Sequence, residues 1–477
     1  MVELKKKYGL ITAICMVVGI VVGSGVFFKA EAMLQITNGD LPVALLSWLL
    51  GGIVMVISAY TFSVMGTKFE KINGIVDYSE ALVGSKYAYY VGWFMASIYY
   101  PAMTSVLAWL SAKYTMALFG IVDTAPETMI LAFVYLICSF ALNTLSPKLA
   151  GHFQVTTTVI KLIPLVLMAV VGIIFGLKNG VLIDNLNSVV EVTTDAAGDA
   201  VYTQVARNGV SFDLLLSGIC TSVFAYEGWI IATAINSELK DAKKNLPRAL
   251  VLGTFIVIVV YMLYYVGISG SIKTAELLPN GAGLAFKTIF GNIAGTILTA
   301  FIAVSCLGTL NGLTLACGRG FFSLAARNQG PRPDYLASVD KATEMPSNAS
   351  IIALIFNALW LFYFYMANLT DLSSYTGKAS IFFFDSSELP LICVYAFYLP
   401  VYINLMRKGK DLNFFRRFVM PTLSLVGAFL FIYAAIAKHG TKNCGFLIIA
   451  FVIMAFGAVM DIFNRKKGNT AKVKKSK

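Results

Sequence analysis

Twelve apolar segments constrain this chain more than any other feature of its sequence. Each segment is roughly long enough to cross the hydrocarbon core of a bilayer as a helix, which takes about 20 residues. In lipid the backbone polar groups must be satisfied within each helix, so the sequence predicts an all-α integral membrane bundle. The segments are 10–34, 41–66, 88–112, 126–145, 151–176, 211–236, 247–270, 291–322, 348–368, 375–402, 413–437 and 443–463.

The composition argues against the soluble classes of protein. Hydrophobic residues make up 58% of the chain and charged residues 13%, whereas a soluble chain carries about 25% charged residues. A soluble enzyme, a disordered chain and a DNA-binding domain are therefore disfavoured, and we expect no nucleic-acid partner. The net charge of +12 has another source in a membrane protein, the bias of Lys and Arg toward cytoplasmic loops.

The distribution of basic residues predicts the orientation in the membrane. An even number of spans places both termini on one side, and most of the 37 Lys and Arg residues fall in the loops and termini of that side. We therefore predict cytoplasmic termini in a cell (plasma or inner) membrane. The basic segment 465–477 is interpreted as a disordered tail near anionic lipid. Lys29 and Lys438 are assigned to loops on the side of the membrane opposite the termini.

The loops and the remaining reactive side chains carry no predicted site. The longest loop on the outside, residues 177–210, is acidic and rich in Asp, Thr, Gly and Ala, and we interpret it as a solvated connection. The seven cysteines are not spaced as metal ligands and are interpreted as small core hydrophobes. His152 and His439 have no partner pattern, so no metal or cofactor is predicted.

The first apolar segment is interrupted near its middle. Gly19, Gly23, Ser24 and Gly25 fall within seven residues, and each glycine costs about 1 kcal/mol in a helix interior. An unwound stretch at the bilayer midplane is tolerated where it faces a cavity. Gly19 and Gly23 alone also fit a helix-packing face of small residues, which remains the alternative for this segment.

A second interruption occurs in the sixth segment, where Glu227 and Gly228 lie mid-span. Interrupted segments at matching places in two halves indicate a transporter site. Five spans per half make the halves inverted in the membrane. We therefore divide the chain into a first five-helix repeat with its outside loop at 1–205, an inverted second repeat at 206–405, two further helices at 406–464 and the basic tail at 465–477.

The two interruptions offer complementary chemistry. Free N–H groups at the start of the half-helix after the first break, those of Gly23, Ser24 and Gly25, suit a carboxylate. Carbonyl groups at the ends of the preceding half-helices suit an ammonium group. A ligand with both groups is an amino acid, although a small anion could use the first site alone.

Three motifs resemble the amino acid–polyamine–organocation (APC) superfamily, and within it the L-type amino acid transporter family and its bacterial relatives. The likeness covers nearly the whole chain. The motifs are Gly23-Ser24-Gly25-Val26-Phe27; Phe224-Ala225-Tyr226-Glu227-Gly228-Trp229 with Glu238-Leu239-Lys240-Asp241 and Lys244-Asn245-Leu246-Pro247-Arg248; and Asn311, Arg319, Ala326-Arg327 and Pro331 with Pro346-Ser347-Asn348-Ala349.

The resemblance implies a leucine-transporter-like fold of twelve transmembrane helices, with an inverted 5+5 repeat, broken helices 1 and 6, and alternating access around a midplane site. It implies that Gly23, Ser24 and Gly25 bind the carboxylate of an amino acid. It further implies that the carbonyls of Val21, Phe224 and Glu227 bind the amino group, that the Phe224 ring closes the site, and that Ala225 lines it. Two departures from the family are Ile20, where many relatives have Ser or Thr, and Glu227, where relatives often have Gly or Asp.

Three charged residues inside the bilayer are candidates for coupling. Lys161 lies about ten residues, or about 15 Å, into its segment, where a charge costs at least about 2.5–3.5 kcal/mol. In the resembling family this lysine occupies the place of a cation in sodium-coupled cousins, which implies sodium-independent transport. Asp385 and Glu388, three residues apart, are predicted to share a helical face and either relay a proton, compensate Lys161, favour a cationic substrate, or form a structural pair.

The sequence therefore predicts a secondary active transporter of amino acids, either a sodium-independent exchanger or a proton-linked permease. A channel-like pore, or a transporter of another small amine or anion, is the alternative. No motif for an enzyme is present, and no partner subunit is evident. Tyr99, in the third segment, is interpreted as a packing or lipid-facing aromatic residue.

Overall fold

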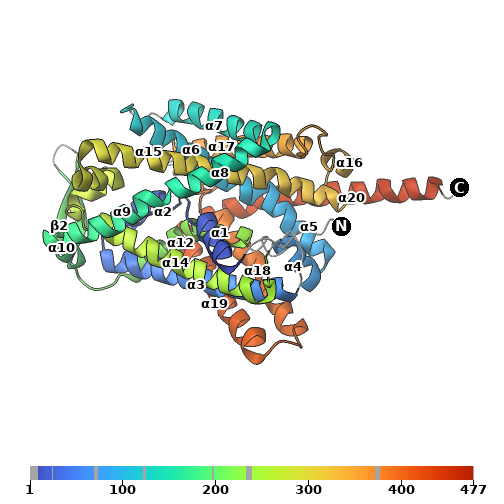
Figure 1. Ribbon diagram of the computed structural model, residues 1–477, viewed down its shortest axis with the longest axis horizontal. Coiled ribbons are helices and arrows are strands. Elements are labelled where there is room, and N and C mark those ends of the chain that lie inside the picture. The colour runs from blue at the N-terminus through green and yellow to red at the C-terminus, as the bar shows by residue number, and fades with distance from the viewer. Residues whose placement is uncertain are drawn as a thin grey trace.

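The protein is a bundle of long helices with one small hairpin (Figure 1). The computed structural model describes residues 9–23, 25–68, 74–121, 125–195, 198–232, 239–370 and 377–475. Among these residues, eight helical segments are long and apolar enough to cross a membrane, which confirms a multi-pass helical membrane protein. They are α3 (Leu41–Lys68), α7 (Ala125–Leu145), α14 (Ala242–Ser269), α15 (Thr274–Ala326), α17 (Ser347–Asn368), α18 (Leu389–Lys408), η6 with α19 (Phe415–Val419 and Met420–His439), and the first part of α20 (Lys442–Lys475).

Four further apolar segments are divided into shorter helices. The pieces of the first and sixth segments end and begin around the glycines noted above. A π-helical turn joins the two helices of the third segment, while the fifth is divided at Lys161 and again by a π-helical turn. In chain order they are α1 (Leu10–Val21) and α2 (Gly25–Ile36); α5 (Ser85–Phe94), η1 (Met95–Tyr99) and α6 (Tyr100–Leu118); α8 (Pro147–Ile160), α9 (Leu162–Leu167), η2 (Met168–Gly172) and α10 (Ile173–Lys178); and α12 (Phe212–Tyr226) and α13 (Trp229–Ala232). Two short helices, α4 (Ile75–Leu82) and α16 (Pro333–Leu336), lie between longer elements.

The tenth apolar segment is not one continuous helix. A 3₁₀ helix, η5 (Lys378–Phe382), is followed by non-helical residues, and α18 begins only at Leu389. The prediction that Asp385 and Glu388 share a helical face is therefore wrong. Asp385 instead accepts a hydrogen bond from the Ser387 amide at 2.7 Å, which stabilises a turn in place of the first helical turn.

The loop at 177–210, predicted to be a solvated connection, is more structured than that. A short helix, α11 (Val181–Leu186), precedes an antiparallel hairpin of β1 (Ser188–Thr194) and β2 (Ala200–Ala206), in which Val190 pairs with Gln204. The Val190 side chain is buried and its amide donates to the Asn38 carbonyl at 2.9 Å. Arg207 and Asp40 form an ion pair at 2.9 Å. These contacts fix the hairpin to the turn between α2 and α3.

The hairpin and the chain termini lie at opposite ends of the bundle (Figure 1). We call these the hairpin end and the terminus end. At the terminus end α20 continues to Lys475, so the prediction of a disordered tail from residue 465 is wrong for the described residues of that segment.

Close packing of α3 against α12 and α14 positions the centre of the bundle. A Cβ atom at Gly51 would lie 2.1 Å from Ser222 Oγ, and one at Gly52 would lie 2.5 Å from the Ile258 side chain. These glycines let α3 approach both helices more closely than any other residue type would. The ring of Trp48 packs edge-on against Tyr226 in the same layer. The end of α12 is therefore held in place at the middle of the molecule.

Candidate functional site

Two helix ends face one another at the centre of the bundle. In the first segment α1 ends at Val21 and α2 begins at Gly25, and Ser24 lies outside the described residues. In the sixth segment α12 ends at Tyr226 and α13 begins at Trp229. Gly228, between them, has φ of +108°, a conformation that residues with a Cβ rarely adopt. Glycine at this position therefore permits the chain to turn away from the helical path.

A small cavity of about 50 Å³ lies between these helix ends. All six described residues of the predicted substrate site line it, although they come from two parts of the chain about 200 residues apart. Side chains from the third and eighth segments complete the wall. The lining residues are Val21, Gly23, Gly25, Phe224, Ala225, Glu227 and Gly228, with Tyr99, Met103, Leu107, Thr309 and Leu313.

The carboxylate of Glu227 is the main polar group of the cavity wall. The Tyr99 hydroxyl donates a hydrogen bond to its Oε1 atom, while Oε2 is buried and accepts no hydrogen bond from the described residues. Both side chains are almost completely buried. Tyr99 is therefore not lipid-facing, and it does more than pack in the core, since its hydroxyl contacts the one acidic side chain of the cavity wall.

The backbone around the first interruption is closely packed, and one of its carbonyl groups already accepts a hydrogen bond. The Val21 carbonyl accepts a hydrogen bond from the Tyr261 hydroxyl at 3.0 Å, which leaves one of its two lone pairs for another donor. A Cβ atom at Gly25 would lie 3.1 Å from the Ala225 Cα and 3.3 Å from the Phe224 carbonyl oxygen. The start of α2 and the end of α12 therefore touch through backbone atoms.

An aromatic ring and a buried ion pair separate the cavity from the hairpin end. Phe224 lines the cavity, and the ammonium of Lys29 lies 5.4 Å from the centroid of its ring. Lys29 in turn pairs with Glu388 at 2.7 Å, and both side chains are at most 2% exposed. These residues come from α12, α2 and the stretch before α18. We call the Lys29–Glu388 pair, together with the Phe224 ring, the hairpin-side gate.

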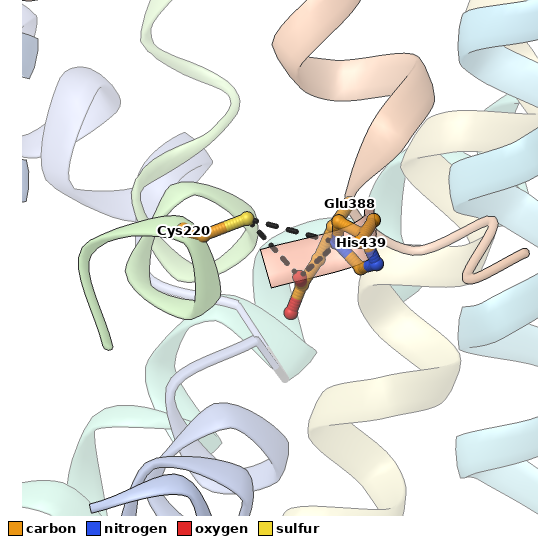
Figure 2. Close-up of side chains that lie close together, drawn as sticks. All are labelled: Cys220, Glu388 and His439. Atoms are coloured by element: carbon orange, nitrogen blue, oxygen red, sulfur yellow. Dashed lines mark hydrogen bonds and ion pairs between the residues drawn. The ribbon is translucent and has the colours of Figure 1, made fainter. Parts of the chain in front are cut away.

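Glu388 is shared by further side chains on its other oxygen. Lys438 lies 2.7 Å from Oε2 and His439 Nε2 lies 3.1 Å from it. The Cys220 thiol donates to the same oxygen at 3.3 Å. Figure 2 shows Cys220 and His439 approaching the Glu388 carboxylate from different elements. Compensation of Lys161, one of the alternatives considered for Asp385 and Glu388, is not observed for Glu388, whose carboxylate instead contacts Lys29, Lys438 and His439.

Lys161 is buried between the fifth and first segments. Its side chain is 4% exposed and its ammonium donates to the Gly19 carbonyl at 2.5 Å. Among the described residues no carboxylate forms an ion pair with it. The ammonium therefore bridges α1 to the junction of α8 and α9, while its role in coupling remains a prediction.

Sequence reasoning missed five residues of this region, namely Tyr99, Lys29, Cys220, Lys438 and His439. Lys29 was counted as a loop charge, although it lies inside the first apolar segment, and that position is the signal that could have identified it. Cys220 and His439 were interpreted as a core residue and an unpartnered residue. No local spacing connects either of them with Glu388, which lies 168 and 51 positions away.

Comparison with known proteins decides the family. Residues 8–458 match the family described as amino acid permease. The chain belongs to the amino acid permease family. Membership confirms the resemblance to the APC superfamily and the predicted function class, secondary transport of amino acids across a membrane.

The permease has relatives in bacteria and mammals. It is 30% identical to the serine/threonine exchanger SteT of Bacillus subtilis over 94% of each chain. It is 25% identical to the b(0,+)-type amino acid transporter 1 of Mus musculus over 82% of this chain and 76% of that one. Its fold is similar to the crystal structure of MhsT in complex with L-phenylalanine, with a TM-score of 0.54 at 15% identity, covering 95% of this chain and 99% of that one.

Proposed function

We propose that this permease is a sodium-independent amino-acid exchanger that works by alternating access, with the cavity between the two helix interruptions as its substrate site. One observation carries the proposal: the ends of α1 and α12 and the start of α2 converge on one buried cavity. Free helix ends supply both amide donors and carbonyl acceptors. A zwitterion needs both kinds of group within a few ångströms.

The two ends of the substrate would bind different parts of this cavity. The amides at the start of α2, at Gly23, Ser24 and Gly25, would hold the carboxylate, because a helix N-terminus carries partial positive charge. The carbonyls of Val21, Phe224 and Glu227 would hold the ammonium group, with Ala225 beneath the substrate backbone. The Phe224 ring would cover the bound amino acid on the hairpin side.

The cavity favours a small amino acid that carries a hydrogen-bond donor. Its volume is small, and its polar wall consists of Glu227, Tyr99 and Thr309. A buried carboxylate oxygen without a partner costs about 1–3 kcal/mol, and a substrate hydroxyl could donate to Glu227 Oε2. The Bacillus subtilis relative, a serine/threonine exchanger, agrees with a substrate of this kind.

The position of Lys161 supports the proposed sodium independence. Its ammonium occupies the space beside the Gly19 carbonyl, where a bound cation would need the same oxygen. Because the charge belongs to the protein, no sodium ion is required to neutralise the exposed carbonyls at the end of α1.

We further propose the membrane arrangement. The eight long helices and the four divided segments would form twelve spans, with the first and sixth as broken helices and spans one to five inverted relative to spans six to ten. The repeats would be 1–205 and 206–405, followed by two helices at 406–464 and the basic segment at 465–477. The termini would lie in the cytoplasm of a plasma or inner membrane, with the basic segment near anionic lipid and no accessory subunit.

The proposal is tested with purified protein in proteoliposomes. Uptake of radiolabelled amino acids is measured with and without unlabelled amino acid inside, in sodium or choline buffer. We expect uptake of a small hydroxylated amino acid that depends on internal substrate and is equal in both buffers. A strict sodium requirement, or equal uptake into empty liposomes, would contradict exchange. Gly25→Val should abolish uptake through the contact with Ala225, whereas Gly151→Val, in open space, should not.

A proton-linked permease is the second candidate, and the buried acids support it. Glu227 faces the cavity, while Asp385 and Glu388 lie near the hairpin-side gate. If one of them carries a proton, an inward proton gradient should drive uptake into liposomes that contain no amino acid. Neutralising that acid should then remove the dependence on the gradient and leave exchange intact. Uptake that does not depend on the proton gradient would support exchange as the mechanism.

A further inference from the structure

Three metal-ligating side chains converge at the hairpin-side gate (Figure 2). Cys220 Sγ lies 3.3 Å from Glu388 Oε2 and 3.7 Å from His439 Nε2. The histidine nitrogen lies 3.1 Å from the same carboxylate oxygen. Cys220 belongs to α12, Glu388 directly precedes α18, and His439 ends α19. Three elements that are distant in sequence therefore present one ligand atom each to a common point.

The spacing of these atoms matches a tetrahedral zinc site. Zinc binds a thiolate at about 2.3 Å and imidazole nitrogen or carboxylate oxygen at about 2.0–2.2 Å. Tetrahedral angles then separate the ligand atoms by roughly 3.4–3.6 Å. The three observed distances each differ from the corresponding value by roughly 0.3 Å or less, so an ion could be received with small side-chain movements. The fourth position would remain for a water molecule.

The surrounding groups hold the carboxylate in the required orientation. Lys29 pairs with Oε1 at 2.7 Å and also donates to Ser387 Oγ at 3.0 Å. This leaves Oε2 turned toward Cys220 and His439. Partners outside the first ring of ligands commonly orient ligand side chains in this way. An ion could reach the site past the end of α19, because Lys438 is 14% exposed and His439 8%, whereas Glu388 is 1% exposed.

Lys438 is the group that competes with a metal ion. Its ammonium lies 2.7 Å from Glu388 Oε2 and 2.8 Å from Thr221 Oγ1. A divalent ion carries twice the charge and also binds the sulfur and the imidazole. When it binds, the Cys220 thiol releases its proton to solvent, the thiolate forms a bond to the metal, and the Lys438 ammonium moves from Oε2 toward the exposed end of α19.

We propose that Cys220, Glu388 and His439 form a binding site for zinc or a similar divalent transition-metal ion. The donor set favours this class of metal, since thiolate and imidazole are poor ligands for magnesium or calcium. A bound ion joins α12 to the start of α18 and the end of α19. It therefore holds the hairpin-side gate closed and inhibits transport. The inhibition rests on the proposed exchange function, whereas the binding site does not.

Binding is tested by titrating the purified full-length protein in detergent with Co²⁺, which serves as an optical probe of thiolate ligation. We expect one equivalent to produce a sulfur-to-cobalt charge-transfer band that zinc abolishes. Cys220→Ser should remove the band, and His439→Asn should weaken binding at least tenfold. Cys138→Ser, at an exposed site away from the cluster, is the matched control and should keep it. Absence of the band, or its persistence in Cys220→Ser, would overturn the site.

Lys438→Met gives a second, opposite test of the same geometry. Removal of the competing ammonium should tighten cobalt binding several-fold, whereas a site elsewhere in the protein would show no change. Weaker binding in Lys438→Met would contradict the proposed coordination by Glu388 Oε2. Because the cluster is buried, the thermal stability of each variant is measured first, and Cys220→Ala replaces Cys220→Ser if the serine variant is unstable.

The effect on transport is measured separately in proteoliposomes. Micromolar zinc should reduce exchange at least fivefold in the unmodified protein and in Cys138→Ser, and should have no effect in Cys220→Ser. Equal inhibition in all three would contradict inhibition through this site. Full exchange by zinc-loaded protein would contradict the proposed inhibition and leave the binding site unaffected. If the protein exchanges no amino acid at all, the proposed function fails, and the cobalt titration still decides the metal site.

Discussion

The Tyr99 hydroxyl donates a hydrogen bond to the Glu227 carboxylate in the wall of the central cavity. Tyr99 ends the π-helical turn η1, and Glu227 directly follows the last residue of α12. The bond therefore joins the third segment to the interruption of the sixth. The second carboxylate oxygen, Glu227 Oε2, is buried and has no hydrogen-bond partner among the described residues.

Loss of the Tyr99 hydroxyl should weaken substrate binding while the fold is kept. A hydrogen bond to a charged group contributes about 1.5–3 kcal/mol, so Tyr99→Phe should raise the KM of exchange about tenfold or more. Tyr433→Phe, at a side chain that is 55% exposed, is the control. The comparison is made from initial rates in proteoliposomes. An unchanged KM would show that Tyr99 does not position Glu227 for the substrate.

Gly228 should not tolerate a side chain. Its φ of +108° would cost an L-residue about 1–3 kcal/mol, so Gly228→Ala should lower the melting temperature and reduce exchange. Gly151→Ala, in an exposed helical position with no neighbour within 4 Å, should leave both unchanged or raise stability slightly. Thermal unfolding in detergent measures the difference, and equal melting temperatures for the two variants would contradict the conformational requirement.

Lys161 should be required for transport, and transport should not depend on sodium. Lys161→Met removes the hydrogen bond to the Gly19 carbonyl. The carbonyl groups at the end of α1 are then left without a nearby cation. Exchange should fall at least tenfold, while the protein remains monodisperse in size-exclusion chromatography. In the unmodified protein, replacing sodium with choline should change nothing. Stimulation of the unmodified protein by sodium would refute the assignment.

The two partners of the gate ion pair should differ in their importance for stability. Lys29→Met leaves Glu388 paired with Lys438. Glu388→Gln instead leaves the buried Lys29 ammonium and the partly exposed Lys438 ammonium without a counter-charge, and an unpaired buried charge costs about 3–5 kcal/mol. Glu388→Gln should therefore lower the melting temperature more than Lys29→Met does, and the double variant should recover part of the loss. The reverse order would contradict the shared carboxylate.

The hydrophobic pattern and the two interruptions could be interpreted without the structure. Apolar segments about 20 residues long have only one way to satisfy their backbone in lipid, so a helical membrane bundle followed from composition. The two interruptions can likewise be recognised from neighbouring residues alone, since glycines and an acidic residue are unusual inside such segments. Val21, Gly23, Gly25, Phe224 and Glu227 do meet around one cavity, as the matched positions of the two breaks predicted.

The local sequence pattern predicted the wrong structure in two places, because contacts with distant residues outweigh the local preference there. The apolar stretch 375–402 predicts one continuous helix, yet the chain leaves the helical path before Leu389. The turn at Asp385 brings Glu388 to the buried ammonium of Lys29. The loop at 177–210 likewise lacks a strong apolar alternation but forms a hairpin, because Val190 and Arg207 bind partners on the turn between α2 and α3.

What the sequence by itself determined is the class of fold, the family and the two helix ends that form the cavity, because each has a signal within a few turns of chain. Only the tertiary structure decided which charges and ligands meet. Lys29 and Glu388 are 359 positions apart, and Cys220 and His439 are 219 apart. Pairings at such separations have no periodicity, since they depend on how α2, α12, α18 and α19 pack at the hairpin end of the bundle.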